Sequence, residues 1–407
     1  MKRIFNRAAA GGMALCLALF SAQTARGYAF HRIVPDLRLP ASVAGTSACP
    51  IPAHRLTAAG SLAVQWSTIL GTSPLTILTQ DQSTSGRLNE IEQAIQESLA
   101  VWTHVSGSAL LPGVLAPLTR AASANLCAAD GLNSICFDQS DAAFTPGVLA
   151  FTRVITADHL GAQVGSGAAA TELGQILDAD LYFNPGDSRV AFATPQALAA
   201  SPAAYDLESV LTHELGHLLG FSHSVVWSAM LDPFAPAPGT YTGTRPTPQR
   251  PDAPLGEDDR SGLRVLYPDA ADTTHIGSIT GRILPANSLS LPAAPTGATG
   301  IFGAHVVALD ALSGNVIAGV LGGWSCGGNG PAQFDGSYRF ERLAVGAAQG
   351  YKIYAEPLNG AVDPPAAGDA LGTLCRNVTT DAGWPSAAAC VVPPVDTSFT
   401  TRLRTSP

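Results

Sequence analysis

Eleven consecutive residues, HELGHLLGFSH, hold the densest group of chemically reactive side chains in this 407-residue sequence. His213 and His217 are four positions apart, and on a helix such positions lie one turn above each other on the same face. Two imidazoles directed toward one point suit a tetrahedral zinc ion. Glu214, beside the first histidine, can reach a metal-bound water without displacing it, as a general base must.

A glycine and a third histidine complete this pattern. Gly220 predicts the end of the helix, because the residue just past a helix end often needs a positive φ angle. The resulting turn would bring His223 back as a third ligand. Three protein nitrogens leave a fourth position for water, which is the arrangement of a catalytic zinc. The alternative is a helix with ordinary core or surface histidines. A short HExxH match alone would be weak evidence against that alternative.

Two helices are predicted to position these residues. The segment LNEIEQAIQESLAVW predicts a helix over residues 88–102, because its apolar residues recur at helical spacing on one face. Those residues are Leu88, Ile91, Ile95, Leu99 and Trp102. The segment DLESVLTHELGHLLG predicts the second helix, with Asp206 as its N-cap.

Strands, a loop and a short helix complete the central region. Residues 147–155 are apolar and β-branched enough for a strand, and residues 176–184 alternate as a half-buried strand would. In that second strand Asp178, Asp180 and Tyr182 would occupy the outer face. A Pro-rich loop over residues 235–254 leads to a last short helix, EDDRSGLRVLYP, which ends at a proline.

The region from about Gln65 to Pro268 resembles the matrixins, the matrix-metalloproteinase-like branch of the metzincin zinc peptidases, here of a bacterial type. HELGHLLGFSH fits the signature HExxHxxGxxH, Ser224 follows the third histidine as in matrixins, and WSAM offers Met230 for the Met-turn. The resemblance implies an α+β metzincin domain, with a twisted mixed sheet, long helices and HExxH on the active-site helix.

The resemblance also implies roles for single residues. One catalytic zinc would be held by His213, His217 and His223, with Glu214 as the general base and Met230 beneath the metal.

The substrate site is implied in the same way. Pro233 and Phe234 would line the pocket for the side chain that follows the scissile bond. Leu149 and Ala150 belong to a strand that would form the upper rim, where an extended peptide adds through backbone hydrogen bonds.

The sequence also departs from the animal matrixins. It has no PRCGxPD cysteine switch, and Cys49 lacks the flanking residues of that motif, so we favour a disulfide over a zinc thiolate for this cysteine. Phe151 stands where those proteins have a histidine that holds a second, structural zinc, so we do not expect a second zinc site here. A calcium ion is a further candidate, because Asp178, Asp180 and Asn184 offer oxygen ligands. Their spacing does not follow the calcium-loop rule, so carboxylates exposed to solvent are the simpler interpretation.

The N-terminal end of the chain suggests export. Residues 1–27 have a basic start and a short apolar stretch, as in a removable signal peptide, and no later segment is apolar enough to span a membrane. Residues 28–62 are expected to be an N-terminal segment or pro-segment. The mature protein would therefore be extracellular or periplasmic.

Six cysteines remain after such a cleavage, and an exported chain favours disulfides. Cys127 with Cys136 and Cys375 with Cys390 are the short-loop pairings, and free thiols are the alternative. The net charge of −9, without a cluster of Lys or Arg, excludes a nucleic-acid partner. We expect a monomer.

From residue 275 to residue 362 the sequence has short alternating runs separated by turns, which predicts a small all-β sandwich. It resembles carboxypeptidase-regulatory-like and transthyretin-like domains, and residues 363–407 form a tail expected to be tied to it by disulfides. His275 and His305 are interpreted as surface or packing residues. We favour a stabilising or spacing role for this domain over a binding role.

Residues 63–268 therefore predict a secreted zinc-dependent metalloendopeptidase that acts on proteins or peptides. Two alternatives remain from other classes. One is a surface adhesin or binding protein with an inactive peptidase-like domain, and the other is a zinc hydrolase acting on a non-protein amide or ester.

Overall fold

The computed structural model describes a central part of the chain and a few short strands. The described residues are 32–33, 51–52, 75–78, 88–110, 115–117, 127–131, 133–136, 144, 147–157, 160–171, 175–184, 190–221, 223–224, 226–286, 299–301, 304–323, 335–345, 350–357 and 402–404. The predicted signal peptide, Cys49 and the pairing of Cys375 with Cys390 lie outside these residues. Among the described helices, none combines the length and apolar character needed to cross a bilayer.

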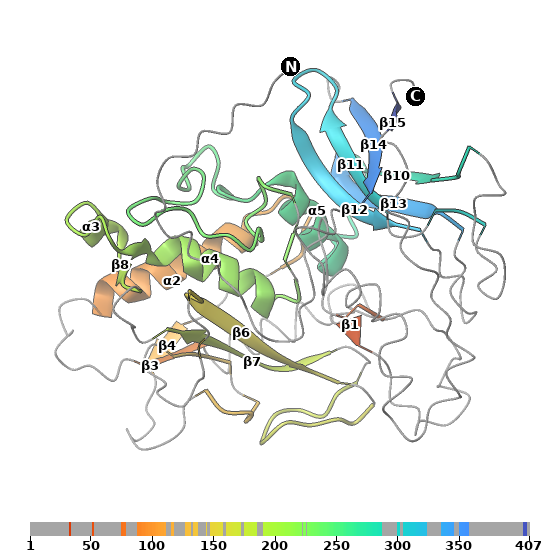
Figure 1. The fold of residues 1–407 in the computed structure, drawn as a ribbon. Helices are drawn as coiled ribbons and strands as arrows, with labels where there is room; N and C mark the ends of the chain where they lie inside the picture. Colours follow the sequence, from red (N-terminus) through yellow and green to blue (C-terminus); the bar gives the residue numbers. More distant parts are fainter. Residues whose placement is uncertain are drawn as a thin grey trace.

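A five-stranded mixed sheet is the base of the part that carries the histidines (Figure 1). Its order is β4 (Leu115–Pro117), β3 (Leu75–Leu78), β5 (Ser134–Cys136), β7 (Ile176–Phe183) and β6 (Ala150–Thr156). The first four strands are parallel, and β6 pairs antiparallel with β7 at the edge. The expectation of a mixed sheet is confirmed. We call this sheet and the helices packed on it the helix-sheet part.

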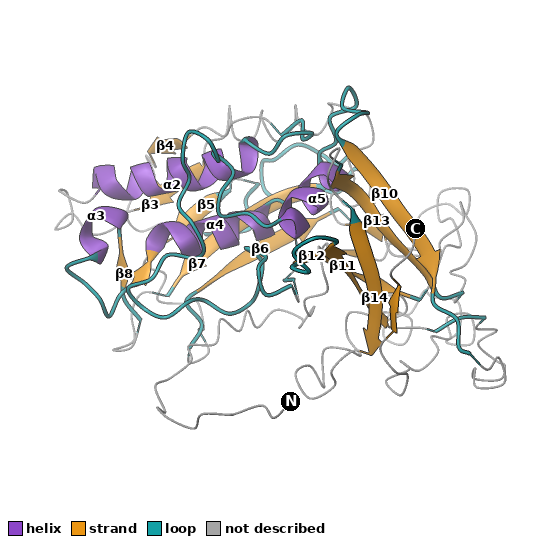
Figure 2. Ribbon diagram, turned by 90° about the horizontal axis from the view of Figure 1, so that it is seen from above, coloured by secondary structure: helices purple, strands orange, loops and turns teal. Residues whose placement is uncertain are grey.

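Two helices lie side by side on one face of the sheet, as Figures 1 and 2 both show. Helix α2 (Leu88–Thr103) buries Ile95, Leu99 and Trp102, so the predicted apolar face is confirmed. Helix α4 (Leu207–Leu218) is buried along its whole length. The two helices are also joined by a hydrogen bond, because the Trp102 indole N–H donates to the Thr212 carbonyl at 2.9 Å.

Gly216 allows α4 to approach its neighbours closely. A β-carbon at this position would lie 2.7 Å from Leu231 Cδ2 and 2.8 Å from Trp102 Cζ2. Both distances are shorter than a carbon–carbon contact of about 3.5 Å, so an added methyl group must displace the packing around it. A helix-interior glycine costs stability by itself, and close packing here is the reason it is accommodated.

We expect Gly216→Ala to lower the free energy of unfolding by about 1–3 kcal/mol through overpacking, although alanine has the better helix propensity. Urea unfolding measures the change. Combined with Leu231→Val, which removes the closest methyl group, the alanine should cost less. A Gly216→Ala protein more stable than wild type would contradict this account.

Strand β7 is buried on both faces, so the prediction of a half-buried strand with solvated carboxylates was wrong. Asp178 and Asp180 are fully buried. Asp178 accepts from the Gly131 N–H at 2.9 Å, and Asp180 accepts from the Ser134 N–H at 3.1 Å. Arg153 on β6 pairs with Asp180 at 2.5 Å. The irregular segment that precedes β5 covers this face and bonds to one oxygen of each carboxylate, and Arg153 neutralises charge on the other side.

Three further contacts lie around the covering segment and strand β7. Cys127 is joined by a disulfide to Cys136, one of the two short-loop pairings favoured above. The Tyr182 hydroxyl donates to the Cys127 carbonyl at 2.6 Å. Asn184 donates its amide to the Val148 carbonyl at 2.8 Å. These bonds fasten the covering segment and the rim of the sheet to β7.

Short elements lead into α4. Strands β8 (Phe192–Ala193) and β9 (Tyr205–Asp206) pair in parallel, with helix α3 (Pro195–Leu198) between them. The two-residue strands β1 (Arg32–Ile33) and β2 (Ile51–Pro52) form a separate antiparallel pair. These small sheets add little area, and the first of them sets the entry to the histidine-bearing helix.

The C-terminal strands form a separate β part. One sheet pairs β10 (Ile276–Arg282) with β13 (Ser337–Ala344), and the other has the order β12 (Val316–Gly322), β11 (Ala304–Asp310), β14 (Tyr351–Pro357) and β15 (Arg402–Arg404). Every pairing is antiparallel. Side chains from both sheets share one apolar cluster. The likeness to carboxypeptidase-regulatory-like domains stays a prediction.

His275 and His305, the two histidines of the C-terminal region, have different environments. His275 is exposed and contacts Asp272. His305 is 9% exposed, and its Nδ1 lies 2.9 Å from Glu356 Oε1 on β14. The reading of His305 as a packing residue agrees with this burial.

Helix α5 (Glu257–Leu266) lies between the two parts, beside β12 and β13 in both Figure 1 and Figure 2. One face of the helix carries Leu263 and Leu266, which join the core of the helix-sheet part. The opposite face is polar and bonds to the β part. Its contacts run from Glu257 to the Ala344 N–H, from Asp258 to the Gly319 N–H, from Ser261 to the Glu341 carbonyl and from Arg264 to the Arg342 carbonyl.

Candidate metal centre

Local signals fix both ends of the helix that carries the first two histidines. Asp206 caps α4 by accepting from the Ser209 N–H at 2.8 Å, as predicted. The helix ends before Gly220, whose φ of 103° belongs to the region that favours glycine. The chain turns there and returns toward α4, so the predicted turn is confirmed.

The turn brings the three histidines together. Each offers one ring nitrogen, and these atoms all lie within 4.8 Å of one another. The ring centroids are 4.7 Å apart for His213 and His217, 5.3 Å for His213 and His223, and 4.7 Å for His217 and His223. Among the described residues, this is the one group of three or more metal-binding side chains with such spacing.

Backbone carbonyls decide which nitrogen of each helical histidine carries a proton. His213 Nδ1 lies 2.8 Å from the Met230 carbonyl, and His217 Nδ1 lies 2.9 Å from the Phe221 carbonyl. A carbonyl only accepts, so each Nδ1 is the donor and each neutral ring keeps a lone pair on Nε2. Burial lowers the pKa of His213 to about 4, which keeps that ring neutral at physiological pH.

The two Nε2 atoms face each other at 3.1 Å. Two lone pairs at this distance repel unless a cation lies between them. Two nitrogens bound to one tetrahedral zinc at about 2.0–2.1 Å are about 3.3 Å apart. The pair therefore fits a zinc ion, and imidazole nitrogen is a ligand that zinc prefers.

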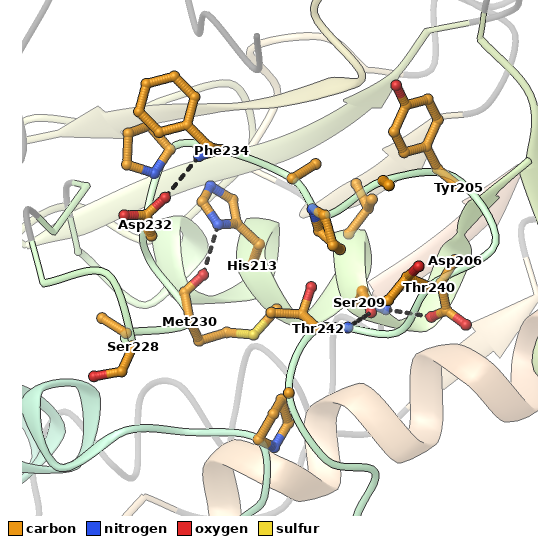
Figure 3. A pocket seen from close by; sticks show the side chains of 18 of the residues that line it. Tyr205, Asp206, Ser209, His213, Ser228, Met230, Asp232, Phe234, Thr240 and Thr242 are labelled. Carbon is orange, nitrogen blue, oxygen red and sulfur yellow. Dashed lines mark hydrogen bonds between the residues drawn. The ribbon is translucent and has the colours of Figure 1, made fainter. Parts of the chain in front are cut away.

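The segment around Met230 is fixed from below by helix α5. Met230 is buried, and its carbonyl orients His213, as Figure 3 shows. Its N–H donates to Asp259 Oδ2 at 2.7 Å, and the Leu231 N–H approaches Asp259 Oδ1 at 3.3 Å. The same carboxylate accepts from the Gly256 N–H at 2.8 Å, at the start of α5. One buried aspartate thus ties this turn to the closing helix.

Glu214 lies beside the histidines, and its side chain contacts the edge strand of the sheet. The Thr152 hydroxyl lies 2.7 Å from Glu214 Oε2 and 3.0 Å from the Glu214 carbonyl. Burial raises the pKa of Glu214 to about 8, against the opposing hydrogen bond from Thr152. A carboxyl with a raised pKa can both take and return a proton near neutral pH. Sequence reasoning missed Thr152, whose β-strand position gave no sign of this contact.

A cavity of about 550 Å³ opens next to the centre (Figure 3). His213 and Glu214 line it, together with Met230 and with Pro233 and Phe234, the two residues predicted for a substrate pocket. Most other lining residues are apolar or small. They include Val210, Ala229, Ala235, Pro236, Ala237 and Pro254.

Leu149 and Ala150, which were predicted to form the upper rim through their backbone, are not among the residues that line this cavity. They are 0% and 2% exposed and belong to the core cluster of the helix-sheet part. Their side chains point into the core because the strand packs against α4. A contact with substrate from this strand must therefore use its backbone.

The wall of the cavity is attached to the first turn of α4 by polar contacts. The Thr242 N–H donates to Ser209 Oγ at 2.9 Å. Arg245 forms ion pairs with Asp206 and Glu208, and its guanidinium lies 4.1 Å from the centroid of the Tyr241 ring. The loop that follows Met230 is therefore held over the helix that bears the histidines.

Replacement of Arg245 tests this attachment. Burial raises the pKa of Glu208 from 4.5 to about 7 against the opposing charge of Arg245. Such a carboxyl favours folding while protonated, so its contribution is lost as pH rises from about 4.5 to 7. Arg245→Ala removes the compensating charge and should cost about 3 kcal/mol at pH 8, and clearly less at pH 5.

Urea unfolding at the two pH values measures this difference. Arg250→Ala, in the same loop but exposed, is the matched control and should change stability little at either pH. An equal loss at pH 5 and pH 8 for Arg245→Ala would show that the two carboxylates do not depend on this guanidinium.

Comparison with known proteins agrees with the class of site that the geometry defines. Residues 153–268 match the family model described as Matrixin. The chain is 36% identical over 93 residues to Metalloendoproteinase 1 of Glycine max, which covers 21% of this chain and 27% of that protein. It is 43% identical over 68 residues to Metalloendoproteinase 1-MMP of Arabidopsis thaliana, which covers 17% and 16%. The chain thus matches about a quarter or less of each relative's length.

Proposed function

We propose that this protein is an exported zinc-dependent endopeptidase whose metal is held by His213, His217 and His223. One observation carries the proposal: two Nε2 lone pairs face each other at 3.1 Å because both Nδ1 protons are committed to backbone carbonyls. The match to the Matrixin family model and the names of the relatives support a metalloprotease. Export rests on the predicted signal peptide of residues 1–27.

The bound zinc would supply a water of lowered pKa and would polarise the substrate carbonyl. The protein residues hold and move protons around it. Glu214 would take the proton of that water and return it to the leaving amine, and the Thr152 hydroxyl holds the carboxylate on the side of β6. Met230, through its carbonyl, keeps the His213 ring in place.

The substrate would bind as an extended peptide. Among the described strands β6 lies at the edge of the sheet, where a substrate could add as a further strand through its backbone. The side chain after the scissile bond would enter the cavity between Phe234 and Val210. We propose an apolar preference there, because most of the lining is apolar.

Replacement of Glu214 tests the proposed reaction. In Glu214→Gln the amide cannot accept the proton, so kcat for peptide cleavage should fall at least 100-fold, while the zinc content should stay near one per chain. Zinc is measured by atomic absorption and cleavage with a peptide library. A chelator should abolish cleavage in the wild type, and added zinc should restore it.

The same assay separates the alternative functions. An inactive binding protein would retain zinc and cleave no peptide, and a hydrolase of non-protein substrates would act on esters or amides without defined peptide sites. A wild-type chain that binds no zinc at all would overturn the proposal.

A further inference from the structure

The β part is connected to the third histidine by a short chain of hydrogen bonds. The Gly319 N–H, on β12, donates to Asp258 Oδ1 at 2.9 Å. The Ser224 hydroxyl donates to Asp258 Oδ2 at 2.7 Å. Ser224 directly follows His223 in the sequence. The two oxygens of one carboxylate thus join a strand of the β part to the loop that carries His223.

Burial makes this connection specific. Asp258 is 0% exposed and Ser224 is 1% exposed. A hydrogen bond to a buried charged group is stronger than one between neutral groups, and loss of a partner leaves the other uncompensated. The loop cannot shift by an ångström without breaking one of these bonds. Asp258 therefore couples the position of β12 to the position of the loop that carries His223.

A second contact runs beside the first. Val226 is 2% exposed, and its N–H donates to Ser224 Oγ at 3.0 Å. A β-carbon built on Gly319 would lie 3.2 Å from Val226 Cγ2 and 2.5 Å from His305 Nε2. Gly319 is therefore a point where β12 approaches the loop, and a larger residue there would have to displace His305 or Val226. His305 cannot move freely, because Glu356 holds its other ring nitrogen.

We propose that the β part positions His223 for metal binding, with Gly319, Asp258 and Ser224 as the positioning residues. This gives the β part a role in the metal centre, beyond the stabilising role expected from its sequence. The inference rests on the proposed zinc site. It does not depend on which bond, if any, the protein hydrolyses.

The experiment uses the full chain and measures the dissociation constant of Zn²⁺ by competition with a chromophoric chelator. Ser224→Ala should weaken zinc binding about 10-fold, as the loss of a residue that orients a ligand typically does. Gly319→Ala should weaken it several-fold, because relief of the new contacts with His305 and Val226 shifts β12 relative to the loop and disturbs the Gly319–Asp258 hydrogen bond. The coordination of Co²⁺ in place of zinc, followed by its visible spectrum, should change in both variants.

Gly322→Ala is the matched control. It is on the same strand, and its β-carbon would lie 3.2 Å from Val306 Cγ2 and 3.2 Å from Tyr338 Cβ, within the β part. It should lower the stability of the β part and leave the zinc affinity unchanged. If Gly322→Ala weakens zinc binding as much as Gly319→Ala, the effect is general destabilisation and the proposal is overturned.

A double variant tests the path. If Gly319 acts through Asp258 and Ser224, then Gly319→Ala should change the zinc affinity less in a Ser224→Ala protein than in the wild type. Independent effects, or an unchanged affinity in Gly319→Ala, would overturn the proposal. A wild-type protein that binds zinc but cleaves no peptide would contradict the proposed activity and leave the positioning role intact. A wild type that binds no zinc would overturn both.

Discussion

The metal centre depends on two hydrogen bonds between histidine rings and backbone carbonyls. By donating Nδ1–H to the carbonyls of Met230 and Phe221, the helical histidines are fixed as one tautomer and one orientation. Both Nε2 lone pairs then face the same point, as two ligands of one metal ion must. The carbonyls belong to the segments that follow α4, so the helix and its downstream loop must both fold before this arrangement exists.

Helix α5 holds that downstream segment through two adjacent carboxylates. Asp259 faces the helix-sheet part and fixes the Met230 backbone, whereas Asp258 faces Ser224 and the β part. Neighbouring positions on a helix differ by about 100° in direction, so one Asp-Asp pair can serve two surfaces. Two consecutive residues thereby fix the Met230 segment, whose carbonyl accepts from His213, and the loop that carries the third histidine.

Interactions that are local in sequence could be predicted, and those formed across long distances could not. Asp206 as a cap and Gly220 as a turn follow from positions within the helix itself. The burial of Asp180 depends on an irregular segment with no periodic signal. The Thr152–Glu214 contact and the Asp258–Gly319 contact each join residues about 60 positions apart, where spacing along the chain carries no information.

The polar character of the α5 interface explains how a β part could influence a site in a different layer. An apolar contact tolerates sliding, because its energy depends mainly on buried area. A buried carboxylate between two donors does not, because the energy of each bond falls steeply with distance and angle. Asp258 Oδ1 would lose the Gly319 N–H if the β part moved away. The two parts therefore keep a fixed relative geometry, at the cost of removing the Asp258 carboxylate from water. A buried carboxylate contributes little net stability, so its role here is better explained by the positioning of the His223 loop.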